Sequence, residues 1–598
     1  MARVGERRIY RSRSPGPPRR VSGRLLAVLG VVVLSLAAGV AALLLARKAA
    51  EPSPREALAP FLTAWSKGDD RAAARLTDRP AEAARVLGEN RKGLDGAAVR
   101  ATIVRLPEPG DDATEAQARL RIRWEIPEIG DWSYETVARL RKGPERWQVV
   151  WAPEIVHPFV DGIARLGTTR DPAERGRILD RRGGAIVTDR AVTRVGVTAG
   201  EVDDPAAVAR ELAGVLDLDA RAFARSIRAA GPRQFVEASV LRRADYRSRR
   251  ARLRDIPGVT TIEDTAPLSP SRRFARALLG TVAPITAEQL ERLGPGYAPG
   301  DLVGQSGLQA ALAVRLGGMP ARRVVLRVDG APRDTLLERG GGKAKPVRTT
   351  LDTRVQQAAE AALGDRSDEA ALVAVKPSTG DVLAVANRPT SSAFDRGVEG
   401  RYPPGSTFKV VSTAALLRDG LSTGETVGCP RTITVGGRPF RNFEGGAGGA
   451  VPFAQDFAQS CNTAFASLAS RLGAGDLRET ARDYGLGEPL PLAVRAPRAS
   501  VPNVGHLASR AAAMIGQDRI LASPLSMAGV AATVAEGRWR APRLLASDPR
   551  RAGPALPAGE RDALRTLMRR VVTSGTGTAA ASVPGAVRGK SGTAEFGD

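Results

Sequence analysis

A serine and a lysine three residues apart follow a proline–glycine turn in the second half of the chain. Residues 402–409 read YPPGSTFK, and the run VVSTAALLR after them is typical of a buried helix. Because Pro404 and Gly405 predict a turn, we expect Ser406 in the first turn of that helix. The spacing places Ser406 and Lys409 on one face, near unpaired N–H groups that favour negative charge. The pattern suits a serine nucleophile with a lysine as its base.

The scarcity of histidine restricts which base such a serine could use. The 598 residues include two histidines, His157 and His506, and no G-x-S-x-G motif surrounds a serine. A Ser-His-Asp triad is therefore not expected, and Lys409 is the candidate base. A lysine accepts a proton only when it is neutral, so its pKa must fall from about 10.4. Burial and a second nearby cation would each lower that pKa, which predicts another lysine in the site.

Two further motifs supply candidates for that lysine and for polar partners. The chain has nine lysines, and Lys409 alone has a serine three positions before it, whereas Lys590 alone begins a Lys-Ser/Thr-Gly triplet. Of the five asparagines, Asn462 alone has a serine two positions before it, which is Ser460. Each motif taken singly could be a surface serine, a capping asparagine or a surface lysine. Three single occurrences in this order are more specific.

The order S-x-x-K, S-x-N, K-S-G resembles the three motifs of the penicillin-binding and serine β-lactamase superfamily. The resemblance implies that Ser406 attacks the carbonyl of a D-alanyl-D-alanine peptide and forms an acyl-enzyme. It implies that Lys409 takes the hydroxyl proton and that Ser460 relays a proton to the leaving amine. Asn462 would hold the substrate's amide.

The same resemblance assigns tasks to the four residues of the last motif. Lys590, expected on a strand, would place positive charge near the substrate carboxylate and help to keep Lys409 neutral. Ser591 keeps a hydroxyl where threonine is commoner, and Gly592 would leave room for substrate along the strand edge. Thr593 would add a hydroxyl for the carboxylate, and its backbone N–H, with that of Ser406, would form the oxyanion hole. We expect no cofactor and no metal, because the histidines make no ligand-spaced cluster with the cysteines.

The region ahead of these motifs predicts a small α+β domain over residues 52–160. Apolar residues recur at helical spacing near Leu58 and Trp65, and from about Val99 the period changes to two in segments such as ARLRIRWEI. Helices followed by an antiparallel sheet resemble the nuclear-transport-factor-like (NTF2-like) domain of certain penicillin-binding proteins, including the methicillin-resistance transpeptidase. The segment has no catalytic constellation of its own.

Residues 161–340 resemble the pedestal, or dimerisation, module of class B penicillin-binding proteins. RGRILDRRG, which begins at Arg175, is similar to that module's opening signature, and GDLVGQSGLQ is similar to its closing one, with Gln309 in place of a glutamate. We expect ion pairs among Arg175, Asp180 and Arg181, although exposed pairs contribute only about 0–1 kcal/mol each.

The flexible stretch GGGKAK leads to a transpeptidase domain over residues 346–598, expected as an antiparallel sheet flanked by helices. The fold class is therefore multidomain α+β. In this family the chain continues beyond the K-S-G strand with a further strand and a long helix. Because the sequence ends at Asp598, we expect it to be a fragment.

One segment predicts where the protein resides. Residues 25–46 are uncharged and long enough to span a bilayer as a helix, and they follow an arginine-rich tail, residues 1–24, that should be disordered and cytoplasmic. A cleaved signal peptide is the alternative, but its apolar part is usually only about 7–15 residues long. We expect a single-pass plasma-membrane protein with its catalytic domain outside. Export argues against nucleic acid as a partner, despite the net charge of +25. Residues 1–24 carry +7 of that charge, and the remaining 25 − 7 = +18 suits anionic lipids and wall polymers.

Cys429 and Cys461 leave two alternatives open. Outside the cytoplasm they could form a disulfide. They could equally remain two unpaired buried cysteines, because the sequence does not show whether their Cα atoms approach each other.

These patterns together predict a monofunctional, membrane-anchored peptidoglycan D,D-transpeptidase of the bacterial cell wall. The expected partners are stem peptides ending in D-Ala-D-Ala, β-lactam antibiotics, the plasma membrane and other cell-wall synthesis or division proteins. A D,D-carboxypeptidase or β-lactamase of the same superfamily is the nearest enzyme alternative. A β-lactam sensor or an inactive wall scaffold is the alternative without catalysis.

Overall fold

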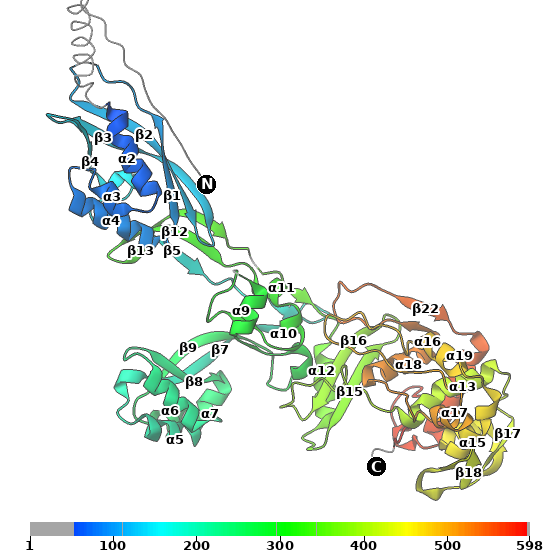
Figure 1. Ribbon diagram of the computed structural model, residues 1–598. Helices are drawn as coiled ribbons and strands as arrows, with labels where there is room; N and C mark the ends of the chain where they lie inside the picture. Colours follow the sequence, from blue (N-terminus) through cyan, green and yellow to red (C-terminus); the bar gives the residue numbers. More distant parts are fainter. Residues whose placement is uncertain (1–52, 111, 295, 343, 595–598) are drawn as a thin grey trace, which may run out of the picture. The chain divides into compact units, whose positions relative to one another are not determined.

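The computed structural model describes residues 53–110, 112–294, 296–342 and 344–594 (Figure 1). The predicted tail (1–24) and membrane span (25–46) lie outside these residues. Within the described ranges, no helix combines the length and apolar character needed to cross a bilayer. The described residues divide into two compact units, one within 1–170 and 322–339 and the other within 171–321 and 340–598. The domain limits expected from the sequence stay predictions.

The first unit contains a four-stranded antiparallel sheet packed with three helices. Its strands follow chain order, and the side chains of β2 alternate between exposed and buried, as the period of two predicts. Helix α2 begins with a capping box between Ser53 and Glu56 and packs against β1 and β4. The elements are α2 (Pro54–Ser66), α3 (Asp70–Ala74), α4 (Pro80–Gly93), β1 (Ala98–Arg105), β2 (Glu115–Ile126), β3 (Gly130–Lys142) and β4 (Trp147–Val150).

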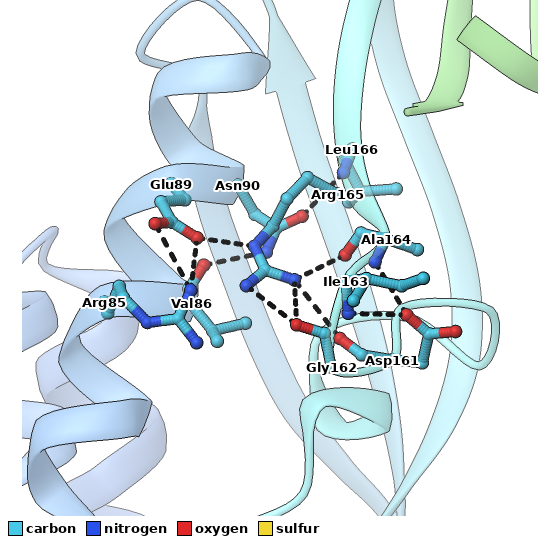
Figure 2. Close-up of polar contacts among 10 residues, drawn as sticks. All are labelled: Arg85, Val86, Glu89, Asn90, Asp161, Gly162, Ile163, Ala164, Arg165 and Leu166. Atoms are coloured by element: carbon cyan, nitrogen blue, oxygen red, sulfur yellow. Dashed lines mark hydrogen bonds and ion pairs between the residues drawn. The ribbon is translucent and has the colours of Figure 1, made fainter. Parts of the chain in front are cut away.

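A second sheet of the same unit joins distant parts of the sequence. Strands β5 (Arg165–Asp171), β12 (Ala321–Val328) and β13 (Ala331–Gly340) lie in the order β13-β12-β5. Figure 2 shows how the start of β5 is fixed to α4. Arg165 Nε donates to Glu89 (2.6 Å), and the Leu166 N–H donates to the buried Asn90 Oδ1 (2.7 Å).

The second unit begins with the region expected to be the pedestal. Strand β7 pairs with β6, β8 and β9, and β14 lies parallel to β6. The bounds are β6 (Ile178–Leu179), β7 (Ala185–Thr198), α5 (Pro205–Ala213), α6 (Ala220–Ala229), β8 (Phe235–Arg242), α7 (Arg243–Arg254), β9 (Val259–Leu268), α8 (Arg276–Leu279), β10 (Val282–Pro284), α9 (Ala287–Leu293), β11 (Leu302–Gly304), α10 (Gly307–Ala311), α11 (Ala313–Gly317) and β14 (Val347–Arg348).

The polar contacts expected in this region form with different partners. Arg175 donates to the Oε1 of the buried Gln309 (2.7 Å), so a neutral amide takes the place expected for a glutamate. Asp180 accepts backbone N–H groups of its own turn, including that of Gly184 (2.8 Å). Arg181 pairs with Asp352 (3.4 Å). The predicted network of Arg175, Asp180 and Arg181 is therefore wrong, because the two arginines contact distant segments and Asp180 accepts N–H groups of its own turn.

The C-terminal part of this unit surrounds the helix that follows Ser406. Helix α13 has buried residues from Lys409 through Leu416, and it packs against α16 and α19 (Figure 1). Strands β15 and β16 pair as an antiparallel hairpin, against which α12 packs. The bounds are α12 (Thr353–Leu363), β15 (Ala370–Lys376), β16 (Asp381–Arg388), α13 (Lys409–Arg418), β17 (Thr426–Cys429), β18 (Thr432–Val435), β19 (Arg438–Arg441), β20 (Gly449–Pro452), α14 (Phe453–Gln459), α15 (Asn462–Ser467), α16 (Asp476–Asp483), α17 (Leu507–Met514), α18 (Pro524–Glu536), β21 (Arg538–Arg540), β22 (Ala552–Ala555) and α19 (Ala558–Ser574).

Candidate active site

Ser406 lies in a tight turn at the start of α13. Residues Gly405–Phe408 form a single 3-10 turn, η3, that continues into the helix. Gly405 has a φ of +54°, and its N–H donates to the carbonyl of Gly516 (3.0 Å). A Cβ at Gly405 would collide with the carbonyl oxygen of Thr593. Glycine is therefore required here by both conformation and space, and the turn is held between two distant segments. Ser406 is 8% exposed.

Lys409 points from the first residue of α13 into the S-x-N motif. Its side chain is fully buried. Its Nζ donates to Asn462 Oδ1 (2.7 Å) and the Ser460 carbonyl (2.9 Å), with Ser460 Oγ at 3.5 Å. The ring of Phe465 lies 5.0 Å away, so the amine also faces an aromatic surface. The structure thus brings the first and second motifs together.

The backbone of Ser460 takes an unusual conformation for a residue with a side chain. Its φ of 62° and ψ of 36° place it in the left-handed region at the end of α14. Asn462 begins α15 two residues later. Such conformations in non-glycine residues concentrate at functional sites, where the surroundings hold them. In this geometry both the carbonyl and the hydroxyl of Ser460 lie within hydrogen-bond distance of Lys409.

Lys590 brings the third motif to the same hydroxyl. Its Nζ donates to Ser460 Oγ (2.8 Å) and to the carbonyl of Ser591 (3.0 Å). The prediction that Lys590 sits on a strand is wrong, because residues 585–594 belong to no helix or strand. A strand needs a backbone partner, and among the described residues none forms a ladder with this segment.

The rest of the third motif packs against the turn that carries Ser406. A Cβ at Gly592 would lie 2.7 Å from Thr407 Cγ2, so the missing side chain permits close approach to that turn. The room at Gly592 is therefore used by protein, whereas we expected it to face substrate. The hydroxyl of Ser591 lies 2.6 Å from that of Thr576. The carbonyl of Thr593 lies beside Gly405.

The two lysines have lowered pKa values. Burial is the main cause for Lys409, and the positive charge of Lys590 lowers its pKa further, well below the ordinary value. Burial lowers the pKa of Lys590 to about 7. This is the direction that a neutral general base requires. Lys590, beside Ser460, is the second lysine that the sequence predicted near Lys409.

Sequence reasoning did not identify Asp456 as part of this site. Asp456 lies on α14, four residues before Ser460, and is 1% exposed. Burial raises its pKa to about 7, and the charge of Lys409 opposes that rise. The signal in the sequence was an acidic residue within the apolar helix FAQDFAQ. That signal is weak, because an acid on an exposed helix face would look the same.

The structure also decides between the two alternatives for the cysteines. Cys429 on β17 and Cys461, the middle residue of the S-x-N motif, form a disulfide with Cα atoms 6.2 Å apart. The N–H of Ala464 donates to Cys461 Sγ (3.3 Å) at the start of α15. The motif is thereby tied covalently to a neighbouring strand.

Three family models match successive parts of the chain. The NTF2-like N-terminal transpeptidase domain matches residues 53–162, the penicillin-binding protein dimerisation domain residues 170–340, and the penicillin-binding protein transpeptidase domain residues 370–598. The matches follow the order that the sequence motifs predicted.

Relatives and solved structures agree with these matches. The peptidoglycan D,D-transpeptidase PbpA of Mycobacterium tuberculosis is 33% identical over 234 residues, which cover 33% of this chain and 47% of that protein. The chain thus spans about half the length of this relative. The peptidoglycan D,D-transpeptidase MrdA of Acinetobacter baumannii is 24% identical over 71% of each chain.

Among solved structures, a chain described under "Structural coordination of polymerization and crosslinking by a peptidoglycan synthase complex" has a TM-score of 0.55 and 27% identity, covering 72% of this chain and 82% of that one. A complex of PBP2 with MreC from Helicobacter pylori contains a chain with TM-score 0.56, covering 72% of this chain and 90% of that one; at 19% identity this likeness shows the fold. Successive parts of the chain thus match the NTF2-like, dimerisation and transpeptidase domains of penicillin-binding proteins, and the last of these parts carries the three motifs.

Proposed function

We propose that this protein is a peptidoglycan D,D-transpeptidase that cross-links stem peptides through an acyl-enzyme on Ser406. The proposal is carried by Lys409, which is one turn from Ser406, is buried, has a lowered pKa and contacts Ser460. A neutral amine at that position can take the serine proton. The names of the relatives support the same activity.

In the first step Ser406 Oγ attacks the carbonyl carbon between the two D-alanines, and its proton passes to Lys409 Nζ. The carbonyl oxygen then carries the negative charge. Backbone N–H groups of Ser406 and Thr593 are the proposed donors to it, usually worth about 10²–10³ in rate per donor. The close packing of Thr593 on Gly405 and of Gly592 on Thr407 supports this pairing of segments.

When the tetrahedral intermediate collapses, the peptide C–N bond breaks and the leaving amine needs a proton. Ser460 Oγ is the proposed relay, because it lies within hydrogen-bond distance of both Lys409 Nζ (3.5 Å) and Lys590 Nζ (2.8 Å). The terminal D-alanine leaves, and the acyl group stays on Ser406. An amine of a second stem peptide then attacks the ester, which forms the cross-link and restores the serine.

In this proposal Asn462 and the residues of the third motif orient the substrate. The Nδ2 of Asn462 donates to the carbonyl of Arg441 (3.2 Å) while its Oδ1 accepts from Lys409, so the amide plane is fixed. Lys590 would attract the terminal carboxylate of the donor peptide, with the hydroxyl of Thr593 as its neighbour. β-Lactams would enter the same site and acylate Ser406.

The proposed location is the outer face of the bacterial plasma membrane, with residues 25–46 as the single anchor and residues 1–24 in the cytoplasm. Other cell-wall synthesis or division proteins are proposed partners, since similar chains were solved with MreC and in a peptidoglycan synthase complex.

Labelling with a fluorescent penicillin tests the activity. The full chain in detergent should take up the label covalently, and Ser406→Ala should not. Ser422→Ala, an exposed turn serine outside the site, is the matched control and should label as the wild type does. A wild type that never labels would remove the enzymatic proposal, and a labelled Ser406→Ala would remove the nucleophile. Acyl-enzyme that clears within seconds would indicate a β-lactamase or carboxypeptidase instead.

A further inference from the structure

The carboxylate of Asp456 has no role in the steps above, yet it is buried close to the residues that perform them. The backbone carbonyl of Asp456 accepts the N–H of Cys461 (2.9 Å), so the residue belongs to the same turn as the S-x-N motif. Among the described residues, its Oδ2 has no hydrogen-bond partner. Burying a carboxylate without a donor is costly, so its presence calls for an explanation.

The groups around Asp456 do not supply that donor. A carboxylate oxygen of Asp456 and the two sulfurs of the Cys429–Cys461 disulfide lie within 4.8 Å of one another, and a disulfide has no S–H to give. Asn442 Nδ2 (2.9 Å) and Thr463 Oγ1 (2.7 Å), which also contact these sulfurs, donate instead to the Pro430 carbonyl. The disulfide therefore gives the acid an apolar neighbour.

The charge that Asp456 senses is that of Lys409. The charges of Asp456 and Lys409 each stabilise the ionised form of the other residue. The positive charge of Lys590 instead destabilises the protonated form of Lys409. The three polar contacts of Lys409 Nζ go to Ser460 and Asn462, so the acid acts through space.

No other titrating group is in position to take over this role within the part of the chain that is described. Strands β17 and β20, which pack on α14, carry no titrating side chain, because Cys429 is in the disulfide. The charged groups of α19 contact other partners: Arg565 the Val534 carbonyl, Arg569 the Val587 carbonyl, Arg570 Gln455, Glu560 Arg418, and Asp562 Arg561.

We propose that Asp456 is a positioning residue whose carboxylate, acting against Lys590, sets the charge state of Lys409 and hence the pH range in which Ser406 is activated. The inference rests on the proposed acylation of Ser406. Ionised Asp456 makes Lys409 a stronger base, whereas Lys590 keeps that base from being protonated at neutral pH. Burial raises the pKa of Asp456 to about 7, so its carboxylate gains its charge within the pH range in which acylation is measured.

The pH dependence of acylation tests this assignment. The second-order rate of labelling by a fluorescent penicillin is measured from pH 4.5 to 9 for the full chain and its variants. Asp456→Asn should move the acid limb of the profile to lower pH, by about one unit, since an opposite charge at close range shifts a pKa by about that much or more. Lys590→Gln should move the limb to higher pH, and the double variant should return it towards the wild type. Opposite displacements are not expected from a loss of packing.

Asp395→Asn is the matched control. Asp395 is also buried, also has an unpartnered Oδ2, and burial raises its pKa to about 6, but no lysine acts on it. Its substitution should leave the acid limb in place. An unchanged limb in Asp456→Asn, or the same shift in Asp395→Asn, would overturn the inference while acylation itself stands. A wild type that is not labelled at any pH would instead overturn the proposed function.

Discussion

The polar cluster at the start of β5 and the lysine cluster beside Ser406 both combine basic and acidic side chains, but they differ in how fully those side chains are paired. In the first, Arg165 donates to Glu89 and to the carbonyls of Gly162 and Ala164, so its donors have acceptors (Figure 2). In the second, Lys409 and Lys590 approach the same Ser460 hydroxyl, and Asp456 Oδ2 has no donor among the described residues. Saturated pairing favours stability, whereas crowded like charges keep groups in reactive protonation states.

The pKa directions of the two acids show the difference. Burial raises the pKa of Glu89, but the hydrogen bonds and charges of Arg165 and Arg85 together outweigh it, so the net pKa is lowered. Burial also raises the pKa of Asp456, and the charge of Lys409 does not outweigh it. One acid is held ionised and the other is held near the point of titration. Four changes would break or sharpen this contrast, taken from the largest expected effect to the smallest.

Replacing Lys409 by methionine should lower the rate of penicillin acylation by about 10³-fold, since the proposed general base is lost while the apolar stem is kept. The rate is measured at pH 7.5 by stopping the labelling reaction at a series of times and quantifying the labelled protein. Arg165→Met is the counterpart in the first unit and should leave acylation unchanged. A Lys409→Met rate within tenfold of the wild type would assign the proton transfer to another group.

Removing the disulfide should lower the free energy of unfolding of the second unit. Cys429 and Cys461 are 32 residues apart in sequence, and closing a loop of this length stabilises by about 3–4 kcal/mol in the chain-entropy account. The Cys429→Ser/Cys461→Ser variant is compared with the wild type by denaturant unfolding. A reductant should destabilise the wild type and leave the variant unaffected; equal stability of the two would contradict the expectation.

Gly405→Ala should slow acylation by about 10–100-fold, because the turn that carries Ser406 must move away from Thr593. Gly420 is the matched control, since it also has a positive φ, of +92°, but has open space around its Cα. Gly420→Ala should cost about 1 kcal/mol of stability through backbone strain alone and keep the wild-type labelling rate. An equal loss of labelling rate in both variants would show that backbone strain, and not the contact with Thr593, slows acylation.

Glu89→Gln should have the smallest effect. The pKa of Glu89 is lowered in the folded state, so its contribution to stability is present above its ordinary pKa of about 4.3 and is lost as pH falls through the folded value. Because Glu89 is substantially exposed, the pair with Arg165 contributes about 0–1 kcal/mol. Unfolding at pH 7 and pH 3 measures this: the variant should be less stable than the wild type at pH 7, and the difference in stability should be smaller at pH 3.

The sequence selected residues whose motifs lie together in the fold, but it predicted their local structure less well. Ser406, Lys409, Ser460, Asn462 and Lys590 could be selected because their spacings are rare in a chain with nine lysines and five asparagines. The prediction of a strand at Lys590 was wrong because strand formation depends on a pairing partner distant in sequence. The Cys429–Cys461 bond and the contact of Gly592 with Thr407 depend in the same way on which segments meet. Asp456 was missed because one acidic letter does not show that its side chain is buried.

The state of Lys590 has a consequence for covalent reagents directed at amines. Activated esters and aldehydes react with neutral amines, and an ordinary lysine at pH 7 is neutral in fewer than about one molecule in a thousand. With a pKa of about 7, Lys590 is neutral in about half. The chain offers such reagents few competing lysines, because its basic residues are mostly arginine. An amine-directed electrophile that binds beside Ser460 would therefore modify Lys590, by a chemistry that does not depend on the serine that β-lactams are proposed to attack.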